Sequence, residues 1–296
     1  MMEQAGQIAT RRYWIGNNGF DCGTKFGILA GIHKFDFRQS LFPEDYVHVE
    51  AIVTFVSQHS LEVKIDVCAE DLSVHEQRLT NSATLWYVTA EVMEDRRVQI
   101  RQLPPLHYES FEDENEGHWR YQLQKDKRMD DYRLYIDYNT GRKRLNEDWN
   151  SNIDHKNFSK HTVQSSQMSL DRMIQASDCN SLGFSNASTI IELMDTTAVM
   201  AASKHCDNPC RTLSIDSINF HRPIRIDSLL TTVAKISTTS DHHLNVKIAA
   251  IAEELNTGQR HFVANASFKL ISMDKNGNPI PVPPLLTFAD LEQLRL

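Results

Sequence analysis

The sequence has no long apolar run, although 41% of its 296 residues are hydrophobic. A membrane-spanning helix needs about 18 or more consecutive apolar residues, and a secretory signal needs about 7–15 of them behind a basic start. Near the N-terminus every run is interrupted by a polar residue, at Glu3, Gln4 and Gln7. We therefore expect neither a membrane span nor a secretory signal, and the scarcity of serine disfavours a mitochondrial presequence.

Cysteine is also sparse, and its pattern excludes two common uses of this residue. The five cysteines are odd in number and show neither CxxC nor metal-ligand spacing: Cys22, Cys68, Cys179, Cys206 and Cys210. Free thiols of this kind are typical of proteins from a reducing compartment. We therefore predict a cytoplasmic protein whose cysteines form neither a disulfide framework nor a metal site.

Basic residues do not predominate either. The formal net charge is −8 at pH 7 and the sequence pI is about 5.9. Binding to a nucleic-acid backbone requires a concentrated basic surface, so we expect no nucleic-acid partner. The length of 296 residues supplies material for about two ordinary domains.

The two halves of the chain repeat each other. The stretch SQHSLEVKIDVCAEDL at 57–72 aligns without a gap with SDHHLNVKIAAIAEEL at 240–255, an offset of 183 residues. The same offset pairs FDFRQSLFPED with INFHRPIRID, and SATLWYV with NASFKLI. Both copies end in Pro-Pro-Leu, at 104–106 and 283–285. Self-similarity of this kind indicates an internal duplication.

Each copy shows the same elements. Apolar and polar residues alternate over 47–55 and 61–67, which predicts half-buried antiparallel strands. Residues 83–88 and 266–271 are rich in aromatic and β-branched residues, which indicates further strands. Ahead of the second set of strands, 188–206 is apolar on almost every side, as is typical of a buried helix. This order predicts an α+β fold in which an antiparallel sheet curls round a central helix.

The first copy looks incomplete at its N-terminus. Residues 1–14 match 193–206 in position and apolar pattern, so that Glu3 falls on Asp195, and no N-cap residue precedes them. The second copy has a strand and a loop ahead of its helix that the first copy lacks. We therefore expect the chain to begin partway along the first helix. The expected domains are a truncated repeat, a charged and partly helical linker, and a second repeat, at 1–106, 107–160 and 161–296.

The expected linker contains FEDENEGHWRYQLQKDKRMDDYRLYID at 111–137, a charged stretch with scattered aromatic residues. Two interpretations are open for it. It could be a helix that docks on a folded surface, or it could be a solvated connector between the repeats. We favour the solvated connector, because charged runs usually face water.

These residues resemble the double-hotdog acyl-coenzyme A thioesterases. The resemblance rests on motifs from both repeats and covers nearly the whole chain: HSLEVKIDV, LTNSATLWYV, QSSQ, LMDTTA, SIDSINFH and PVPPL. It implies two tandem hotdog domains packed as an intramolecular pair, and assembly into a homo-oligomer, a trimer of such pairs. It also implies hydrolysis of fatty acyl-CoA to a free fatty acid and CoA, without a metal ion or organic cofactor.

The candidate catalytic residue is Asp195. Thioester hydrolysis needs a water made nucleophilic and a hydrogen-bond donor for the oxyanion that forms on the carbonyl. Asp195 lies within the apolar helix, where aspartate is a poor helix former, and it falls on the Met-Asp position of the family. The resemblance therefore implies that Asp195 is the general base, at a site between the two repeats. Glu192 and Glu3 match no working position of the family, and we expect them to be structural.

The loop before the second helix departs from the family pattern, which reads roughly Asn-x-x-Gly-x-x-His-Gly-Gly. Gly183 remains, but Asn186, Ala187 and Ser188 replace His-Gly-Gly. Each new Cβ crowds the place where backbone N–H groups would meet the substrate. Gly183, Asn186 and Ser188 stay candidate substrate-binding residues. Arg222 is a further candidate, either as a contact to CoA phosphates or as part of a plain exposed loop.

Three alternatives stay open beside an active thioesterase. A catalytically impaired subunit that binds acyl-CoA or serves assembly would fit the altered glycines and the missing Asn-bearing loop of the first repeat. A start at an internal methionine of a longer, active protein would fit the incomplete first copy. A hotdog dehydratase or hydratase is disfavoured, because its His/Asp pair is not visible in the sequence.

Overall fold

The computed structural model describes residues 1–16, 25–71, 76–93, 98–140, 161–180 and 182–286. Its chain divides into two compact units, Met1–Asp130 and Asp131–Leu296. Cys22 and residues 141–160 of the expected linker lie outside the described residues. The domain boundaries expected from the sequence stay a prediction.

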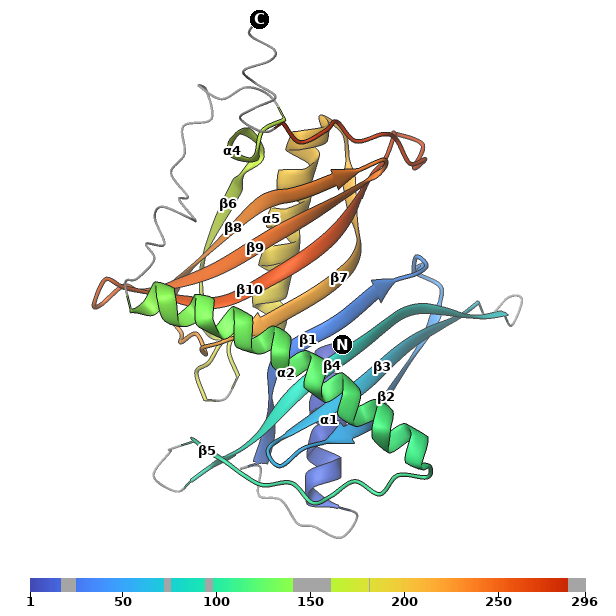
Figure 1. The fold of residues 1–296 in the computed structure, drawn as a ribbon, viewed down its shortest axis with the longest axis vertical. Helices are drawn as coiled ribbons and strands as arrows, with labels where there is room; N and C mark the ends of the chain where they lie inside the picture. Colours follow the sequence, from blue (N-terminus) through green and yellow to red (C-terminus); the bar gives the residue numbers. More distant parts are fainter. Residues whose placement is uncertain (17–24, 72–75, 94–97, 141–160, 181, 287–296) are drawn as a thin grey trace, which may run out of the picture. The chain divides into compact units, whose positions relative to one another are not determined.

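In the first unit, an antiparallel sheet packs against one helix (Figure 1). Its elements are α1 (Met2–Ile15), β1 (Lys25–Phe37), β2 (Tyr46–Val56), β3 (Ser60–Asp71), β4 (Glu76–Val92) and β5 (Val98–Ile100). The strands neighbour one another in the order β2-β3-β4-β1, and β5 pairs with β4. The helix α1 begins without a side-chain cap and ends at Gly16, whose φ of 69° suits glycine.

The second unit repeats this plan with a longer helix. After α4 (Val163–Ser166) come β6 (Met168–Met173), a 3₁₀ helix (Ala176–Asp178), α5 (Ala187–Cys206), β7 (Cys210–Phe220), β8 (Ser228–Ser240), β9 (His243–Glu254) and β10 (Gln259–Ser272). The strand order is β7-β10-β9-β8-β6, and α5 lies along one face of this sheet (Figure 1). The prediction of a sheet curled round a helix is confirmed, and this arrangement is the hotdog fold.

The two sheets share one register. Ser60 lies opposite Val88 where β3 meets β4, and His243 lies opposite Ile271 where β9 meets β10. Each residue of the second pair stands 183 positions after its counterpart in the first. A slip of one residue would turn every side chain of a strand to the other face. The common register therefore means that both copies bury equivalent positions.

A hydrogen bond at the end of each central helix is also repeated. The Tyr13 hydroxyl donates to the carbonyl of Pro104 at 2.9 Å, and the His205 Nε2 donates to the carbonyl of Pro283 at 3.0 Å. Both prolines begin the repeated Pro-Pro-Leu motif. The motif thus ties the segment after the last strands to the last turn of the helix in each unit.

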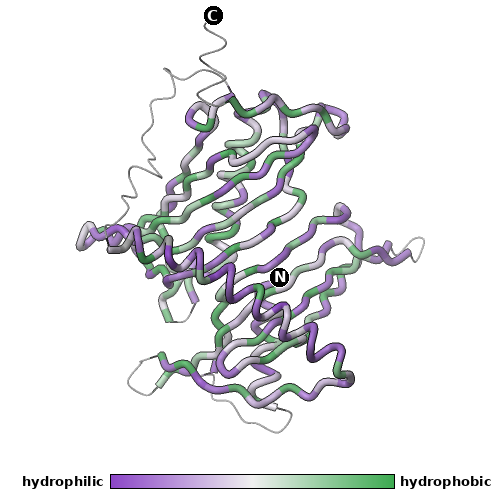
Figure 2. The backbone as a smooth tube through the Cα atoms, in the orientation of Figure 1, coloured by the Kyte–Doolittle hydropathy of each residue, from purple (hydrophilic) through white to green (hydrophobic). Residues whose placement is uncertain are grey.

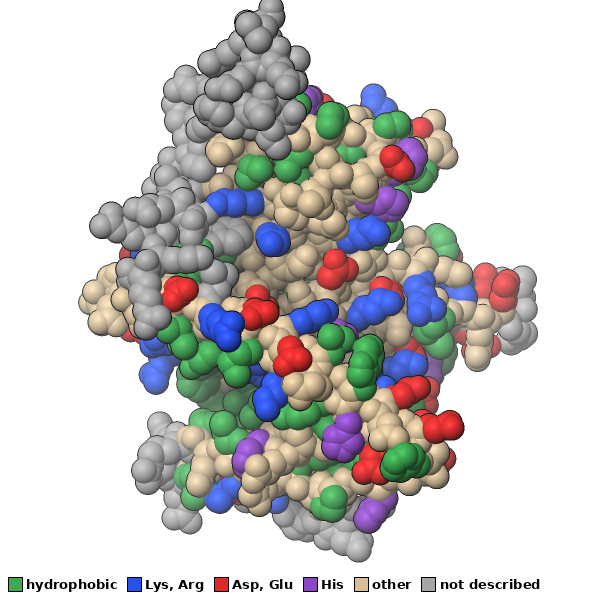
Figure 3. All heavy atoms as spheres, viewed as in Figure 1, with side chains coloured by type: hydrophobic (Ala, Val, Ile, Leu, Met, Phe, Trp, Pro, Cys, Tyr) green, Lys and Arg blue, Asp and Glu red, His purple; other side chains and the backbone are tan. Residues whose placement is uncertain are grey.

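The helix α2 (Phe111–Asn139) corrects the expectation of a solvated connector. It is largely hydrophilic (Figure 2), and acidic and basic side chains occur side by side on the face that Figure 3 shows. In the first unit, however, its Tyr121 ring stacks on Phe55 with centroids 5.1 Å apart. In the second unit, its Tyr138 is 7% exposed and packs on Phe262 at 5.1 Å. The many charged residues therefore concealed the few rings through which the helix docks.

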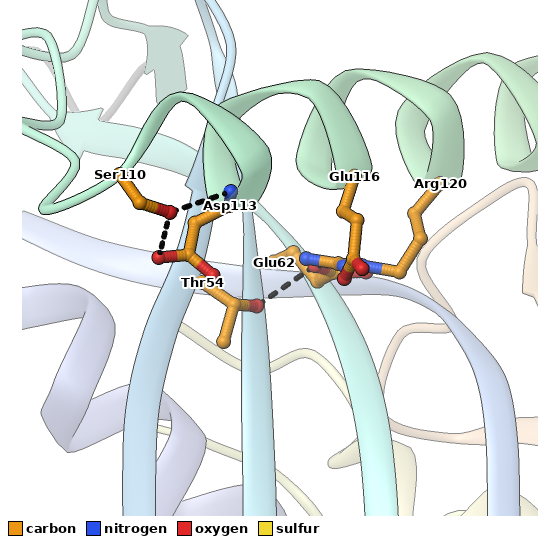
Figure 4. A network of polar contacts seen from close by, with 6 residues as sticks. All are labelled: Thr54, Glu62, Ser110, Asp113, Glu116 and Arg120. Carbon is orange, nitrogen blue, oxygen red and sulfur yellow. Dashed lines mark hydrogen bonds and ion pairs between the residues drawn. The ribbon is translucent and has the colours of Figure 1, made fainter.

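A buried ion pair secures α2 in the first unit (Figure 4). The carboxylate of Glu62, on β3, has an exposed fraction of only 1%. Arg120 of α2 donates from Nε to both carboxylate oxygens, at 3.2 and 3.0 Å, and the Thr54 hydroxyl donates to Oε2 at 2.8 Å. At the start of α2 the Ser110 hydroxyl accepts from the backbone N–H of Asp113 at 3.1 Å, which caps the helix.

Replacing Arg120 with methionine is expected to lower the free energy of unfolding by about 3 kcal/mol, because it leaves a buried carboxylate without its counter-charge. Adding Glu62→Gln removes that charge and should restore most of the loss. Urea unfolding of the wild type, both single variants and the double variant measures the coupling. Losses that simply add in the double variant would show that the pair does not hold the helix.

Candidate active site

The structure places Asp195 at the third turn of α5, facing the start of β7. The Thr212 hydroxyl of β7 donates to Asp195 Oδ1 at 2.5 Å. Asp195 is half-buried, and among the residues that the structure describes its Oδ2 has no hydrogen-bond partner. One oxygen of the carboxylate is thus anchored, while the other is left to accept a hydrogen bond from a water or a substrate group.

Two opposing effects set the basicity of this carboxylate. Burial raises the pKa of Asp195 above its ordinary value, because desolvation disfavours the charged form. The hydrogen bond from Thr212 lowers that pKa, because it stabilises the charged form. Burial is the larger effect. A carboxylate of raised pKa is a stronger base, which suits it to take a proton from water.

The equivalent place in the first unit is built differently. Glu3 stands where Asp195 stands, and its Oε1 accepts from the side-chain amide of Gln7 at 3.3 Å. Leu29 occupies the position of Thr212, 183 residues earlier, and the two lie opposite equivalent residues of β4 and β10. No hydroxyl can therefore come from that position to anchor a carboxylate on α1. This difference agrees with the expectation that Glu3 is structural.

The loop before α5 is held to the loop after β7. Gly183 has a φ of 77°, a conformation that side-chain-bearing residues rarely adopt, and its carbonyl accepts from the N–H of Ile226 at 3.1 Å. The N–H of Ser185 donates to the carbonyl of Ile224 at 2.8 Å. Gly183 thus has a definite backbone role, and its loop lies beside the one that carries Arg222.

Asn186 and Ser188 lie at the start of α5. Asn186 is the N-cap residue, although its side chain makes no capping hydrogen bond, and Ser188 is exposed in the first turn. At about 1.5 Å of rise per residue, the helix separates Asn186 from Asp195 by about 13 Å along its axis. The structure therefore does not bring these two candidates to the candidate base. Their role in substrate binding stays a prediction.

Arg222 lies apart from Asp195, in a cluster of polar side chains with His261 and Glu254. Its Nη1 lies 3.0 Å from His261 Nδ1, and its Nη2 lies 3.6 Å from Glu254 Oε1. These residues line a cavity of about 200 Å³ together with Phe184 and Arg225. The candidates from the sequence thus fall in two places, Asp195 on α5 and Arg222 in a cavity beside the Gly183 loop.

Thr212 is the residue that the sequence analysis missed. The signal was available in the internal alignment, where a threonine stands at the position of a leucine in the other copy. Among the described residues, no group of three or more His, Cys, Asp or Glu side chains is arranged to hold a metal ion. The described cysteines, Cys68, Cys179, Cys206 and Cys210, are free thiols. No helix in the described part of the chain is long and apolar enough to cross a membrane.

Comparison with known proteins shows which family the chain resembles. The Thioesterase superfamily profile matches residues 182–259. The cytosolic acyl coenzyme A thioester hydrolase of Rattus norvegicus is 33% identical over 100% of this chain and 73% of its own length, and the one of Homo sapiens is 32% identical over the same shares. A solved apo-hexameric acyl-CoA thioesterase covers 47% of this chain and 90% of its own at 23% identity, with a TM-score of 0.42.

The fold is that of a hotdog thioesterase. Identity of 33% to the rat protein over the whole chain shows the family as well as the fold. The protein belongs to the family of acyl-CoA thioester hydrolases.

Replacing Asp195 with asparagine is expected to raise the free energy of unfolding at pH 7. Because burial raises its folded-state pKa, the native state binds the proton more tightly than the unfolded state does. The free energy of unfolding of the wild type therefore falls as pH rises from the ordinary value of 3.8 through the folded-state pKa. Urea unfolding from pH 4 to pH 8 should show the advantage of Asp195→Asn shrinking toward acid. A difference in the free energy of unfolding between the variant and the wild type that does not change with pH would contradict a raised pKa for Asp195.

Proposed function

We propose that this chain hydrolyses fatty acyl-CoA to a free fatty acid and CoA, with Asp195 as the general base that activates the attacking water. Full-length identity to proteins named as cytosolic acyl coenzyme A thioester hydrolases supports the reaction. A cytosolic location and assembly into a trimer of double hotdogs belong to the same proposal and rest on that family resemblance. The position of the substrate between the repeats is likewise a prediction from the resemblance.

The observation that carries the proposal is the arrangement of Asp195 and Thr212. The Thr212 hydroxyl donates to Oδ1 at 2.5 Å and so restrains the carboxylate. Oδ2 then accepts a proton from a water, and the hydroxide attacks the thioester carbonyl carbon. The carbon–sulfur bond breaks, and CoA leaves as a thiolate that takes the proton back from Asp195, which restores the base. A fixed base removes the cost of orienting the carboxylate at the moment of reaction.

The oxyanion that forms on the carbonyl needs hydrogen-bond donors. The start of α5 is the element suited to supply them, since backbone N–H groups in the first turn of a helix point along its axis and carry partial positive charge. In this chain Ala187 and Ser188 stand there in place of glycines. We therefore expect slower turnover than in a family member with the glycine-rich loop, and the alternative of an acyl-CoA-binding subunit without turnover rests on the same substitution.

Asp195→Asn is expected to reduce hydrolysis of palmitoyl-CoA by about 10²–10⁴-fold, the range that a positioned base contributes. Release of the CoA thiol by the purified chain measures this. Glu192→Gln is the matched control, because Glu192 is a carboxylate on the same helix that is 72% exposed. A wild type that binds palmitoyl-CoA without turnover would favour the binding subunit, and full activity in Asp195→Asn would remove Asp195 from the mechanism.

Thr212→Val is expected to raise the pKa of Asp195 further, because it removes the hydrogen bond that lowers this pKa. The acid limb of the profile of kcat/KM against pH should therefore move to higher pH, with lower activity on that side. The same thiol-release assay across pH 5–9 measures the shift. A profile that falls in height without moving along the pH axis would mean that Thr212 only supports packing.

A further inference from the structure

The cavity that contains Arg222 has an unusual excess of hydrogen-bond donors. It lies at one end of the second sheet, between the Gly183 loop, the segment that follows β7, and the ends of β9 and β10. Two guanidinium groups line it, those of Arg222 and Arg225, and Glu254 is the acidic residue in its lining. With His261 neutral, the ionisable side chains of the lining carry a net positive charge.

The hydrogen on His261 can be assigned from its neighbour. A guanidinium group can only donate, so the contact of 3.0 Å between Arg222 Nη1 and His261 Nδ1 makes Nδ1 the acceptor. The ring hydrogen of the neutral imidazole must then lie on Nε2. Burial lowers the pKa of His261, and Arg222 lowers it further, which keeps the ring in this neutral form.

That Nε2–H is left without an acceptor. Nε2 is buried, and it has no hydrogen-bond partner among the described residues. Glu254 Oε1 lies 3.9 Å away, beyond hydrogen-bonding distance. A buried N–H without an acceptor costs free energy, so the site favours a ligand that brings an acceptor oxygen to this point.

The arginines indicate what kind of acceptor that ligand carries. Arg222 lies 3.6 Å from Glu254, a loose contact that leaves most of its guanidinium donors available. Arg225 is an exposed residue of the loop between β7 and β8. Its guanidinium carbon lies 5.7 Å from the centroid of the Phe184 ring. Guanidinium groups match phosphate oxygens in geometry and charge. A phosphate monoester offers three such oxygens.

We propose that this cavity binds a phosphate monoester, with His261 Nε2–H and the guanidinium groups of Arg222 and Arg225 as its donors. Its volume of about 200 Å³ is several times the roughly 30 Å³ share of one water in the liquid, so a phosphate with part of its ester group fits. The phosphate could come from CoA or from a free phosphate compound. The assignment is independent of the reaction at Asp195.

Isothermal titration of the full chain with CoA tests the site. CoA holds no thioester, so its binding can be measured without any turnover. Arg225→Gln changes an exposed side chain, and His261→Phe removes the Nε2–H while it keeps a ring of similar size. Each is expected to weaken binding by about tenfold, in line with the loss of one charge-assisted hydrogen bond. Lys275→Gln, in an exposed turn, is the control that should leave binding unchanged.

Two further probes identify the source of the phosphate. Dephospho-CoA lacks the 3′-phosphate, so if CoA fills the site with that group, Arg225→Gln should weaken binding of CoA and not of dephospho-CoA. If a free phosphate fills it, the variants should leave CoA binding intact and weaken binding of inorganic phosphate. Unchanged affinity of both Arg225→Gln and His261→Phe for CoA and for inorganic phosphate would overturn the proposal.

Discussion

The burial of α5 against its sheet is the constraint on which the second unit depends. Buried residues occur on nearly every side of this helix, and many of them are small: Thr189, Ile190, Met194, Thr197, Ala198, Ala201, Ala202, His205 and Cys206. A polar group on such a helix must find a partner, because burial without one is costly. Thr197 meets Thr232 at 2.6 Å, and His205 meets Ser166 at 2.8 Å. Asp195 likewise accepts a hydrogen bond from Thr212, and its burial raises its pKa.

Each sheet packs against a helix on one face, and α2 adds contacts of a different chemistry in each unit. α1 and α5 bring apolar surfaces to the inner faces, as their packing against the strands shows. α2 brings a charged surface with a few rings, such as Tyr121 and Tyr138, and one arginine that reaches the buried Glu62. Because α2 has so little apolar surface, a few specific contacts account for much of its attachment to the sheet. That is why a single ion pair matters there.

The two units pair their strands in the same register, but they carry different residues at the position of Asp195. Asp195 and Thr212 form an anchored carboxylate in the second unit, whereas Glu3 and Leu29 occupy the same positions in the first. The strands keep the common register because it decides which residues are buried. The phosphate site proposed around His261 belongs to the same unit but uses other strands.

Much of the fold could be predicted from the sequence, because periodicity and an internal repeat are properties of neighbouring residues and of one fixed offset. The helix at 188–206, the strand at 61–67 and the curled sheet all follow from periodicity and the repeat. Asp195 follows from the family's Met-Asp motif within that helix. What only the tertiary structure decided are pairings between distant residues. The hydroxyl of Thr212 reaches Asp195, Arg120 reaches Glu62, and Arg222 sets the tautomer of His261. These contacts depend on how the chain packs in space, because burial and direction give a polar side chain its chemistry, and no local pattern records them.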